Sequence, residues 1–381
     1  MNVRVDRNKD GIWCARAYLG TDHLTGLQRR PYKTFPEART EAEAKAAANA
    51  WIESLADGTI VDQLESYVDT KEANGAAKNT IRQYRGFIKN HVARLMPYEI
   101  PAQITPAELT SFEGRLLRGD SSHKPLARST VVAMHWFLQG GFRFMHTTLK
   151  TIKNNPMSDV AHPKRDRFEA IALDEADFAK LNRWIEQGLQ DKEHPQFRAQ
   201  VFAVWLGINT GMRVGEVCAV RRRDFSCACK MISVSGTVIE IQEVERQDKP
   251  KTVSSRRNIS VTKDVADRII DFERWQDATF GPLTPNNPIA TWDGNYLRPS
   301  QLSSWFTQQA RQLGLPKGTS FHTLRHTHAT FLILSGADIK TVQERLGHES
   351  STTTLDLYGH VLPGRDQAAA EAFEMLAKEV R

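Results

Sequence analysis

Apolar residues recur at spacings of three and four through most of the chain, and this periodicity predicts a mainly helical protein. The clearest case is the stretch AKNTIRQYRGFIKNHVARL, where five apolar side chains make one stripe along a helix. They are Ile81, Tyr84, Ile88, Val92 and Leu95. Residues 59–160 are therefore predicted to form one helical domain. After a charged, proline-containing linker near Pro163, residues 168–381 are predicted to form a second domain, of mixed but mainly α type.

Two segments break the helical pattern. Before residue 56, IWCARAYLG alternates, HLTGLQRRPYKTF follows as the next strand or two, and a helix is predicted to start near Pro36. A small sheet packed on one helix results. Within the last domain, the stretch beginning MISVSGTVIEIQ is predicted to turn at Gly236, loop through basic residues and return as an antiparallel strand.

Composition narrows the function classes. The chain has 381 residues, of which 40% are hydrophobic and 25% charged, as in ordinary soluble proteins of two or three domains. It shows no apolar run that could span a bilayer and no signal-peptide core, and its four scattered cysteines favour a reducing compartment. A cytoplasmic protein is therefore expected. The net charge of +6 permits a polyanionic partner without demanding one.

Two groups of basic residues are candidates for nucleic-acid contact. Lys78, Arg82, Arg85 and Lys89 recur on one face of the helix quoted above, without interleaved acids. Because such cations repel one another, the pattern favours phosphate contact over a solvated face. A second group, predicted to share one strand, is equally compatible with a solvated surface. It consists of Arg29, Arg30 and Lys33.

Residues 320–361, SFHTLRHTHATFLILSGADIKTVQERLGHESSTTTLDLYGHV, contain five of the twelve histidines. His322 and His326 have the spacing of a zinc peptidase motif, but Thr323 stands where the general base would be. A lone C-x-C pair, Cys227 and Cys229, adds little support for a metal. A metal site is therefore disfavoured.

The residue types fit phosphoryl transfer better. The transition state of a phosphodiester carries spread negative charge, which planar guanidinium groups match. His322 and Arg325 share a helix face in this stretch, and His348 and Tyr358 follow them. Upstream, TGMRVGE offers Arg213 in an apolar setting that predicts burial, with Glu216 or a substrate phosphate as its anion. Lys251 lies in a loop that leads into a strand.

Taken together, four motifs resemble those of tyrosine recombinases of the phage-integrase type, in the same order. TGMRVGE, KTVSSRR, HTLRHTHAT and LGHESSTTTLDLYGHV resemble the arginine box, lysine hairpin, histidine–arginine box and nucleophile segment. The resemblance covers about residues 168–362. It implies the three domains of a mobile-element integrase: an arm-type DNA-binding domain (1–56), a helical, SAM-like core-binding domain (59–160) and a catalytic domain with a tail helix (168–381).

The resemblance also implies a role for each matching residue. Arg213 and Arg325 would clamp the scissile phosphate, with Glu216 orienting Arg213. Tyr358 would attack phosphorus and form a 3′-phosphotyrosyl link. Lys251, with Lys249 as its rival, would protonate the leaving 5′-oxygen. His322 would help to take the tyrosine proton, and His348 would donate a hydrogen bond to the phosphate. Because the covalent link stores the bond energy, neither a metal nor ATP is expected as a cofactor.

The implied partners are double-stranded DNA attachment sites, further copies of the chain in a homotetramer on synapsed DNA, and an excisionase or DNA-bending accessory protein. The stripe of Ala369, Phe373, Leu376 and Val380 in the tail would dock on a neighbouring copy or on its own domain. His326, His328 and His360 match no family position and are interpreted as helix or surface residues. Two other classes stay open: a type IB topoisomerase-like relaxing enzyme, and a non-catalytic DNA-binding regulator.

Overall fold

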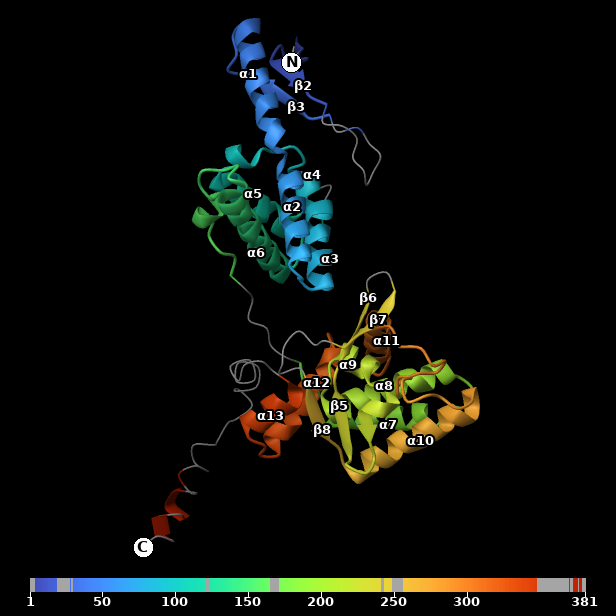
Figure 1. Ribbon diagram of the computed structural model, residues 1–381. Helices are drawn as coiled ribbons and strands as arrows, with labels where there is room; N and C mark the ends of the chain where they lie inside the picture. The colour runs from blue at the N-terminus through green and yellow to red at the C-terminus, as the bar shows by residue number, and fades with distance from the viewer. Residues whose placement is uncertain are drawn as a thin grey trace. The chain divides into compact units, whose positions relative to one another are not determined.

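The computed structural model describes residues 4–18, 28, 30–120, 124–164, 171–240, 243–248, 256–347, 370, 373–375 and 377–378. The chain divides into two compact units, residues 1–167 and 168–381. Helices dominate both units, and each carries small antiparallel sheets (Figure 1). The predicted fold class, mainly helical with a small N-terminal sheet, is therefore confirmed.

The first unit begins with a three-stranded antiparallel sheet, β1 (Val5–Arg7), β2 (Trp13–Arg16) and β3 (Tyr32–Phe35), covered by helix α1 (Glu41–Ser54). Phe35 and Trp51 meet edge to face in the core between sheet and helix. The helix starts later than predicted from Pro36. Thr40 is its N-cap, because the Thr40 hydroxyl accepts a hydrogen bond from the Glu43 amide and the Glu43 carboxylate accepts from the Thr40 amide.

The three basic residues of this segment do not form one strand face. Lys33 lies in β3, but Arg30 precedes the strand, so the prediction that they share a strand is wrong for Arg30. Arg29 lies outside the described residues. Lys33 donates through Nζ to Gln103 Oε1 at 3.0 Å.

The rest of the first unit is helical. Its elements are α2 (Ile60–Ala73), α3 (Lys78–Phe87), a π-helical turn (Ile88–Val92), α4 (Ala93–Leu95), α5 (Pro106–Arg118), α6 (Arg128–Phe144), a second π-helical turn (Met145–Leu149) and short 3₁₀ turns at Leu55–Asp57, Pro101–Gln103 and Pro156–Asp159. All five residues of the apolar stripe predicted from the sequence lie in or against its core.

Two glycines bring helices α2 and α6 together. A Cβ on Gly140 would lie 2.4 Å from the Tyr67 hydroxyl oxygen, and one on Gly141 would lie 2.3 Å from Leu64 Cδ2. These residues therefore serve close packing, although in the sequence they look like weak points of a helix. His135, on the same helix, is buried and hydrogen-bonded to Glu113 at 2.8 Å.

The second unit is built around helix α8 (Pro195–Thr210), which is buried on nearly all sides and packs against α7 (Glu175–Leu189) and α12 (Phe321–Leu334). Its other helices are α9 (Val214–Ala219), a 3₁₀ turn (Arg222–Asp224), α10 (Lys263–Phe280), α11 (Pro299–Gln312) and α13 (Ile339–Leu346). Its strands are β4 (Phe225–Ser226), β5 (Met231–Val234), β6 (Thr237–Glu240), β7 (Val244–Gln247) and β8 (Arg257–Ser260).

The strands pair differently from the prediction. The expected hairpin about Gly236 is wrong, because β5 pairs with β8 while β6 pairs with β7, in two separate sheets. The buried side chain of Arg246 lies against Gly236, between β5 and β6: a Cβ on Gly236 would be 2.7 Å from Arg246 Cζ. Arg246 donates to the Ala219 carbonyl and to Ser235 Oγ, both at 2.9 Å. The Arg246 side chain therefore fills the space beside Gly236, where the chain passes from β5 to β6.

Candidate active site

The last carbonyls of helix α13 hold three guanidinium groups. Each of three consecutive carbonyl oxygens accepts one hydrogen bond: Arg345 from Arg257 Nε at 2.7 Å, Leu346 from Arg325 Nη2 at 2.7 Å and Gly347 from Arg213 Nη2 at 3.3 Å. Carbonyls at the end of a helix lack intrahelical partners and carry the negative end of the helix dipole. The end of α13 therefore attracts cations, and it gathers here residues that lie more than one hundred positions apart in the chain.

Arg325 lies on α12 with 1% of its surface exposed. Besides the Leu346 carbonyl, it donates through Nη1 to the Gly211 carbonyl at 2.8 Å. Gly211 ends α8 with φ +68°, and a Cβ there would lie 2.8 Å from both His328 Cδ2 and Leu346 Cδ2. Glycine is therefore required at this position both for the left-handed backbone and for the close approach of α12 and α13.

Arg213 stands at the N-cap position of α9. Its Nη1 donates to Glu216 Oε1 and its backbone amide to Glu216 Oε2, both at 2.9 Å. The side chain is 41% exposed, so the expectation of a largely buried setting is wrong for it, although Glu216 is the anion partner suggested by the sequence. Part of the Arg213 side chain therefore faces solvent, where an anionic ligand can reach it.

Arg257 is a site residue that the sequence analysis missed. Its Nη2 lies 2.9 Å from Glu216 Oε2, and both side chains are buried. Burial raises the pKa of Glu216, but Arg257 and Arg213 outweigh this effect and hold the pKa below its ordinary value. Arg257 stands at the start of β8 and is the last residue of the motif KTVSSRR, which was the signal that could have identified it.

His322 lies in the first turn of α12 with an exposed side chain, and its ring centroid is 4.5 Å from that of buried His326. Although part of His322 reaches solvent, desolvation of its ring by the surrounding side chains lowers its pKa, and the nearby charges of Arg325 and Arg213 lower it further. The imidazole is therefore neutral near pH 7 and can accept a proton.

The remaining catalytic candidates, Lys251, its rival Lys249, His348 and Tyr358, lie outside the described residues, as does His360. In sequence, the described elements nearest to them are β7 and β8 for the lysines and α13 for His348. The site residues that the structure brings together are thus Arg213, Glu216, Arg257 and Arg325, with His322 beside them.

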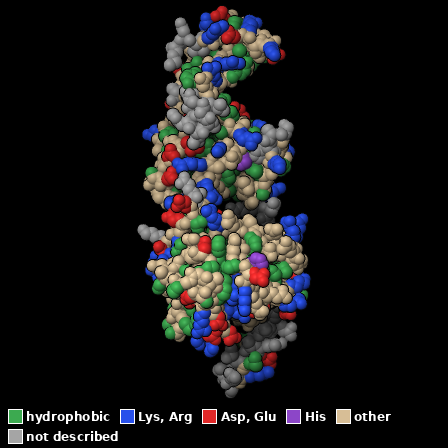
Figure 2. Space-filling model, turned by 90° about the vertical axis from the view of Figure 1, so that its right-hand side faces the viewer, with side chains coloured by type: hydrophobic (Ala, Val, Ile, Leu, Met, Phe, Trp, Pro, Cys, Tyr) green, Lys and Arg blue, Asp and Glu red, His purple; other side chains and the backbone are tan. Residues whose placement is uncertain are grey.

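The proposed cationic face of α3 needs a correction. Arg85 makes ion pairs with three acids of the neighbouring helix α2, at 2.6 Å to Glu72, 3.0 Å to Asp69 and 4.0 Å to Glu65. Helix α3 itself carries no acid between the four cations, but acids of the neighbouring helix α2 pair with Arg85, so this residue is not an unbalanced cation. Lys78, Arg82 and Lys89 have exposed side chains. On the face drawn in Figure 2, basic side chains lie in several groups with acids among them.

Metal ligands do not gather in the described part of the chain: no group of three or more His, Cys, Asp or Glu side chains is placed to hold an ion there. Cys227 and Cys229 are exposed thiols. Within the same residues, no helix is both long and apolar enough to cross a membrane.

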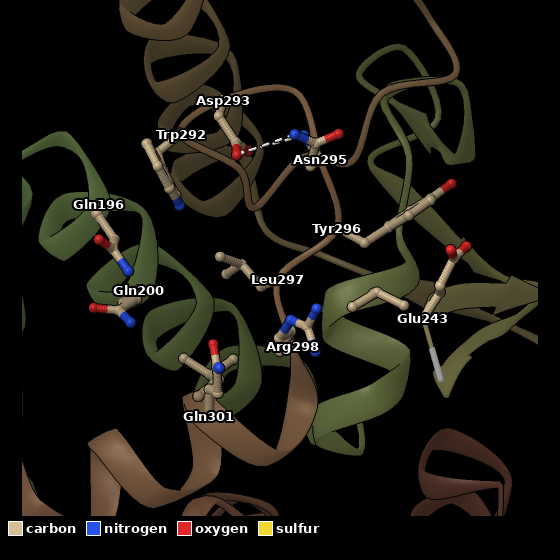
Figure 3. A pocket seen from close by; sticks show the side chains of 12 residues that line it. Gln196, Gln200, Glu243, Trp292, Asp293, Asn295, Tyr296, Leu297, Arg298 and Gln301 are labelled. Carbon is tan, nitrogen blue, oxygen red and sulfur yellow. Dashed lines mark hydrogen bonds between the residues drawn. The ribbon is translucent and has the colours of Figure 1, made fainter. Parts of the chain in front are cut away.

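A separate polar pocket of about 460 Å³ lies in the second unit (Figure 3). Gln196 and Gln200 line it from α8 and Gln301 from α11, and Trp292, Tyr296 and Arg298 line it from the segment that leads into α11. None of the candidate catalytic residues described above lines it.

Comparison with known proteins finds integrases and tyrosine recombinases similar to this chain. The model of the phage integrase family matches residues 172–365, which is half of the chain. The chain is 27% identical over 239 residues to the integrase of Staphylococcus phage L54a, covering 58% of this chain and 67% of that protein. It is 23% identical over 385 residues to the ICEBs1 integrase of Bacillus subtilis strain 168, covering 98% and 100%. The Tn1549 transposon integrase, solved in complex with a circular intermediate DNA, superposes with TM-score 0.66 at 20% identity, covering 83% of this chain and 99% of that one.

The fold and the matched family model define a site-specific DNA recombinase of the tyrosine class. The chain belongs to the phage integrase family. These findings favour a recombinase over the relaxing enzyme and the non-catalytic regulator that the sequence left open.

Proposed function

We propose that the chain is the integrase of a mobile element and that it cuts and rejoins DNA through a 3′-phosphotyrosyl intermediate. The Tyr358 oxygen attacks the scissile phosphorus, and the bond from phosphorus to the 5′-oxygen breaks. His322 takes the proton of the tyrosine, and Lys251 gives a proton to the leaving 5′-oxygen. Rejoining reverses these steps with the 5′-hydroxyl of another strand as the nucleophile.

One observation carries this proposal: the guanidiniums of Arg213 and Arg325 converge on neighbouring carbonyls at the end of α13, directly before His348 in the chain. Two guanidiniums held side by side suit the non-bridging oxygens of a phosphodiester in its transition state. His348 adds a hydrogen bond to the same phosphate, and Glu216 orients Arg213. One phosphate ester replaces another in each step, so the reaction requires neither ATP nor a metal.

The domain roles are part of the proposal. Residues 1–56 bind arm-type DNA, with Arg29, Arg30 and Lys33 as contacts, and residues 59–160 bind the core site. Lys78, Arg82 and Lys89 contact the core-site backbone there, while Arg85, committed to the acids of α2, holds α3 in place. Residues 168–381 catalyse the reaction. The active species is a homotetramer on two synapsed DNA sites in the cytoplasm, at the nucleoid, assisted by an excisionase or a DNA-bending protein.

The test is a nicked suicide substrate, from which the cleaved strand cannot be rejoined. The full chain should form a covalent complex that resists denaturant, and digestion should place the nucleotide on the peptide that carries Tyr358. Tyr358→Phe should bind the same DNA and form no such complex. A nucleotide on any other peptide, or an adduct from Tyr358→Phe, would overturn the assignment. Joining of two different duplexes by the wild-type protein separates a recombinase from a relaxing enzyme.

A further inference from the structure

His328 occupies a position between three elements of the second unit. It lies on α12 three residues after Arg325, and its Nδ1 is 2.8 Å from the Ile208 carbonyl on α8. Its Nε2 accepts a hydrogen bond from Arg345 Nε at 2.9 Å. A carbonyl can only accept and a guanidinium can only donate, so Nδ1 carries the proton and Nε2 does not. His328 is a helix residue, as the sequence predicts, and its ring is also hydrogen-bonded to two neighbouring helices.

Arg345 is in turn held from several sides. Its Nη1 donates to the Ser260 carbonyl at 3.1 Å, at the end of β8, and its Nη2 donates to the Asn209 carbonyl at 3.4 Å, near the end of α8. The backbone carbonyl of Arg345 is the first of the three that accept from the arginines of the site. The side chain thus ties the end of α13 to α8, α12 and β8 at the point where the site guanidiniums bind.

We propose that His328 is a positioning residue for cleavage: as a neutral imidazole it orients Arg345, and Arg345 places the carbonyls that hold Arg325 and Arg213 at the phosphate. The inference rests on the proposed function. A charged imidazole would repel Arg345, and burial together with Arg345 lowers the pKa of His328 to about 4. The neutral form therefore persists throughout the pH range in which such an enzyme is assayed.

The primary test compares cleavage with binding. His328→Phe keeps a ring of similar size and removes both hydrogen bonds. We expect single-turnover cleavage of the suicide substrate to fall about 10- to 100-fold, as small misplacements of catalytic groups do, while core-site affinity stays within about twofold of wild type. His328→Gln, which can still accept from Arg345, should recover much of the cleavage rate.

A matched control separates positioning from loss of stability. Ile333 lies on the same helix, in the apolar cluster between α12 and α13. Ile333→Ala therefore removes packing but no hydrogen bond of an arginine. At equal loss of thermal stability it should cleave near the wild-type rate. Equal cleavage losses in Ile333→Ala and His328→Phe would overturn the inference, as would wild-type cleavage by His328→Phe.

Two further readouts respond to positioning alone. A methylphosphonate at the scissile site removes the charge that the guanidiniums stabilise, so the defect of His328→Phe should shrink on that substrate.

His328→Phe combined with Arg345→Met should cleave no more slowly than the worse single variant, because both remove the same hydrogen bond. If the cleavage losses of the two single variants multiply in the double variant, the inference is overturned. If His328→Phe does not fold, Arg345→Met carries the test. Absence of a covalent complex in the wild type would instead refute the proposed function.

Discussion

Arg257 and Glu216 form an ion pair that is buried on both sides, with Arg257 Nη2 2.9 Å from Glu216 Oε2 and 6% and 7% of the two side chains exposed. The same carboxylate accepts from Arg213, which is 41% exposed. Glu216 therefore links a buried arginine of β8 to the half-exposed arginine that we assign to the phosphate. The geometry of Arg213 thus depends on a residue with no proposed contact to DNA.

Removing the carboxylate charge should destabilise the second unit. Glu216→Gln removes the carboxylate charge that pairs with the buried Arg257 guanidinium, and breaking a buried ion pair costs roughly 3 kcal/mol of unfolding free energy. Denaturant unfolding of the full chain, followed by hydrogen exchange in α8 and α12, measures the loss. Asp267→Asn, which removes the exposed ion pair with Lys263, is the control and should change nothing measurable. A loss no larger than that of the control would contradict the buried pair.

The same pair predicts a pH dependence. The pKa of Glu216 in the folded protein lies below its ordinary value of 4.5, so the stabilisation is complete above about that pH and is lost as the pH falls through the folded pKa. The difference in melting temperature between wild type and Glu216→Gln should therefore be largest near neutral pH and shrink in acid. Thermal unfolding between about pH 3 and pH 7 tests this. A difference that stays constant across the range would exclude the charge as its source.

Lys251→Ala should lose cleavage severely on ordinary DNA, because the 5′-oxygen is a poor leaving group without a proton. A substrate with a bridging 5′-sulfur has a better leaving group and should restore cleavage in this variant. The readout is single-turnover covalent-complex formation on both substrates, with DNA binding measured in parallel. Lys249→Ala is the matched control and should cleave ordinary DNA well. Rescue of Lys249→Ala in place of Lys251→Ala would transfer the role to Lys249.

The ion pairs of Arg85 sharpen the prediction for the helix that carries it. Neutralising Lys78 and Lys89, both exposed, should weaken core-site binding and reduce the slope of log affinity against log salt by about 1.8, which is two phosphate contacts at about 0.9 each. Arg85→Gln should leave that slope nearly unchanged, because its charge is already balanced by acids of α2. A larger slope change from Arg85→Gln than from the lysine pair would show that Arg85 leaves its acids to bind DNA.

Phe373, in the tail, has 74% of its surface exposed. We predict that Phe373→Ala with Leu376→Ala binds a single core site normally but forms fewer synaptic complexes and recombines less. Native gels that count protomers per DNA, run beside a recombination assay, measure both effects. Lys378→Ala, a polar change in the same tail, is the control. Full tetramer yield and normal recombination from the double variant would exclude docking on a neighbouring copy.

From the sequence alone, the helical class, the small N-terminal sheet and the family could be predicted, and so could Glu216 as a partner of Arg213. Helices follow from local periodicity, and short motifs such as TGMRVGE and HTLRHTHAT keep their chemistry within a few residues. Only the tertiary structure decided the strand pairing of β5 with β8, the ion pairs of Arg85, and the contacts of Arg257 with Glu216 and of His328 with Arg345. Each of these depends on contacts between residues far apart in the chain. Side-chain spacing within one segment carries no information about such contacts, because packing of whole elements brings the partners together.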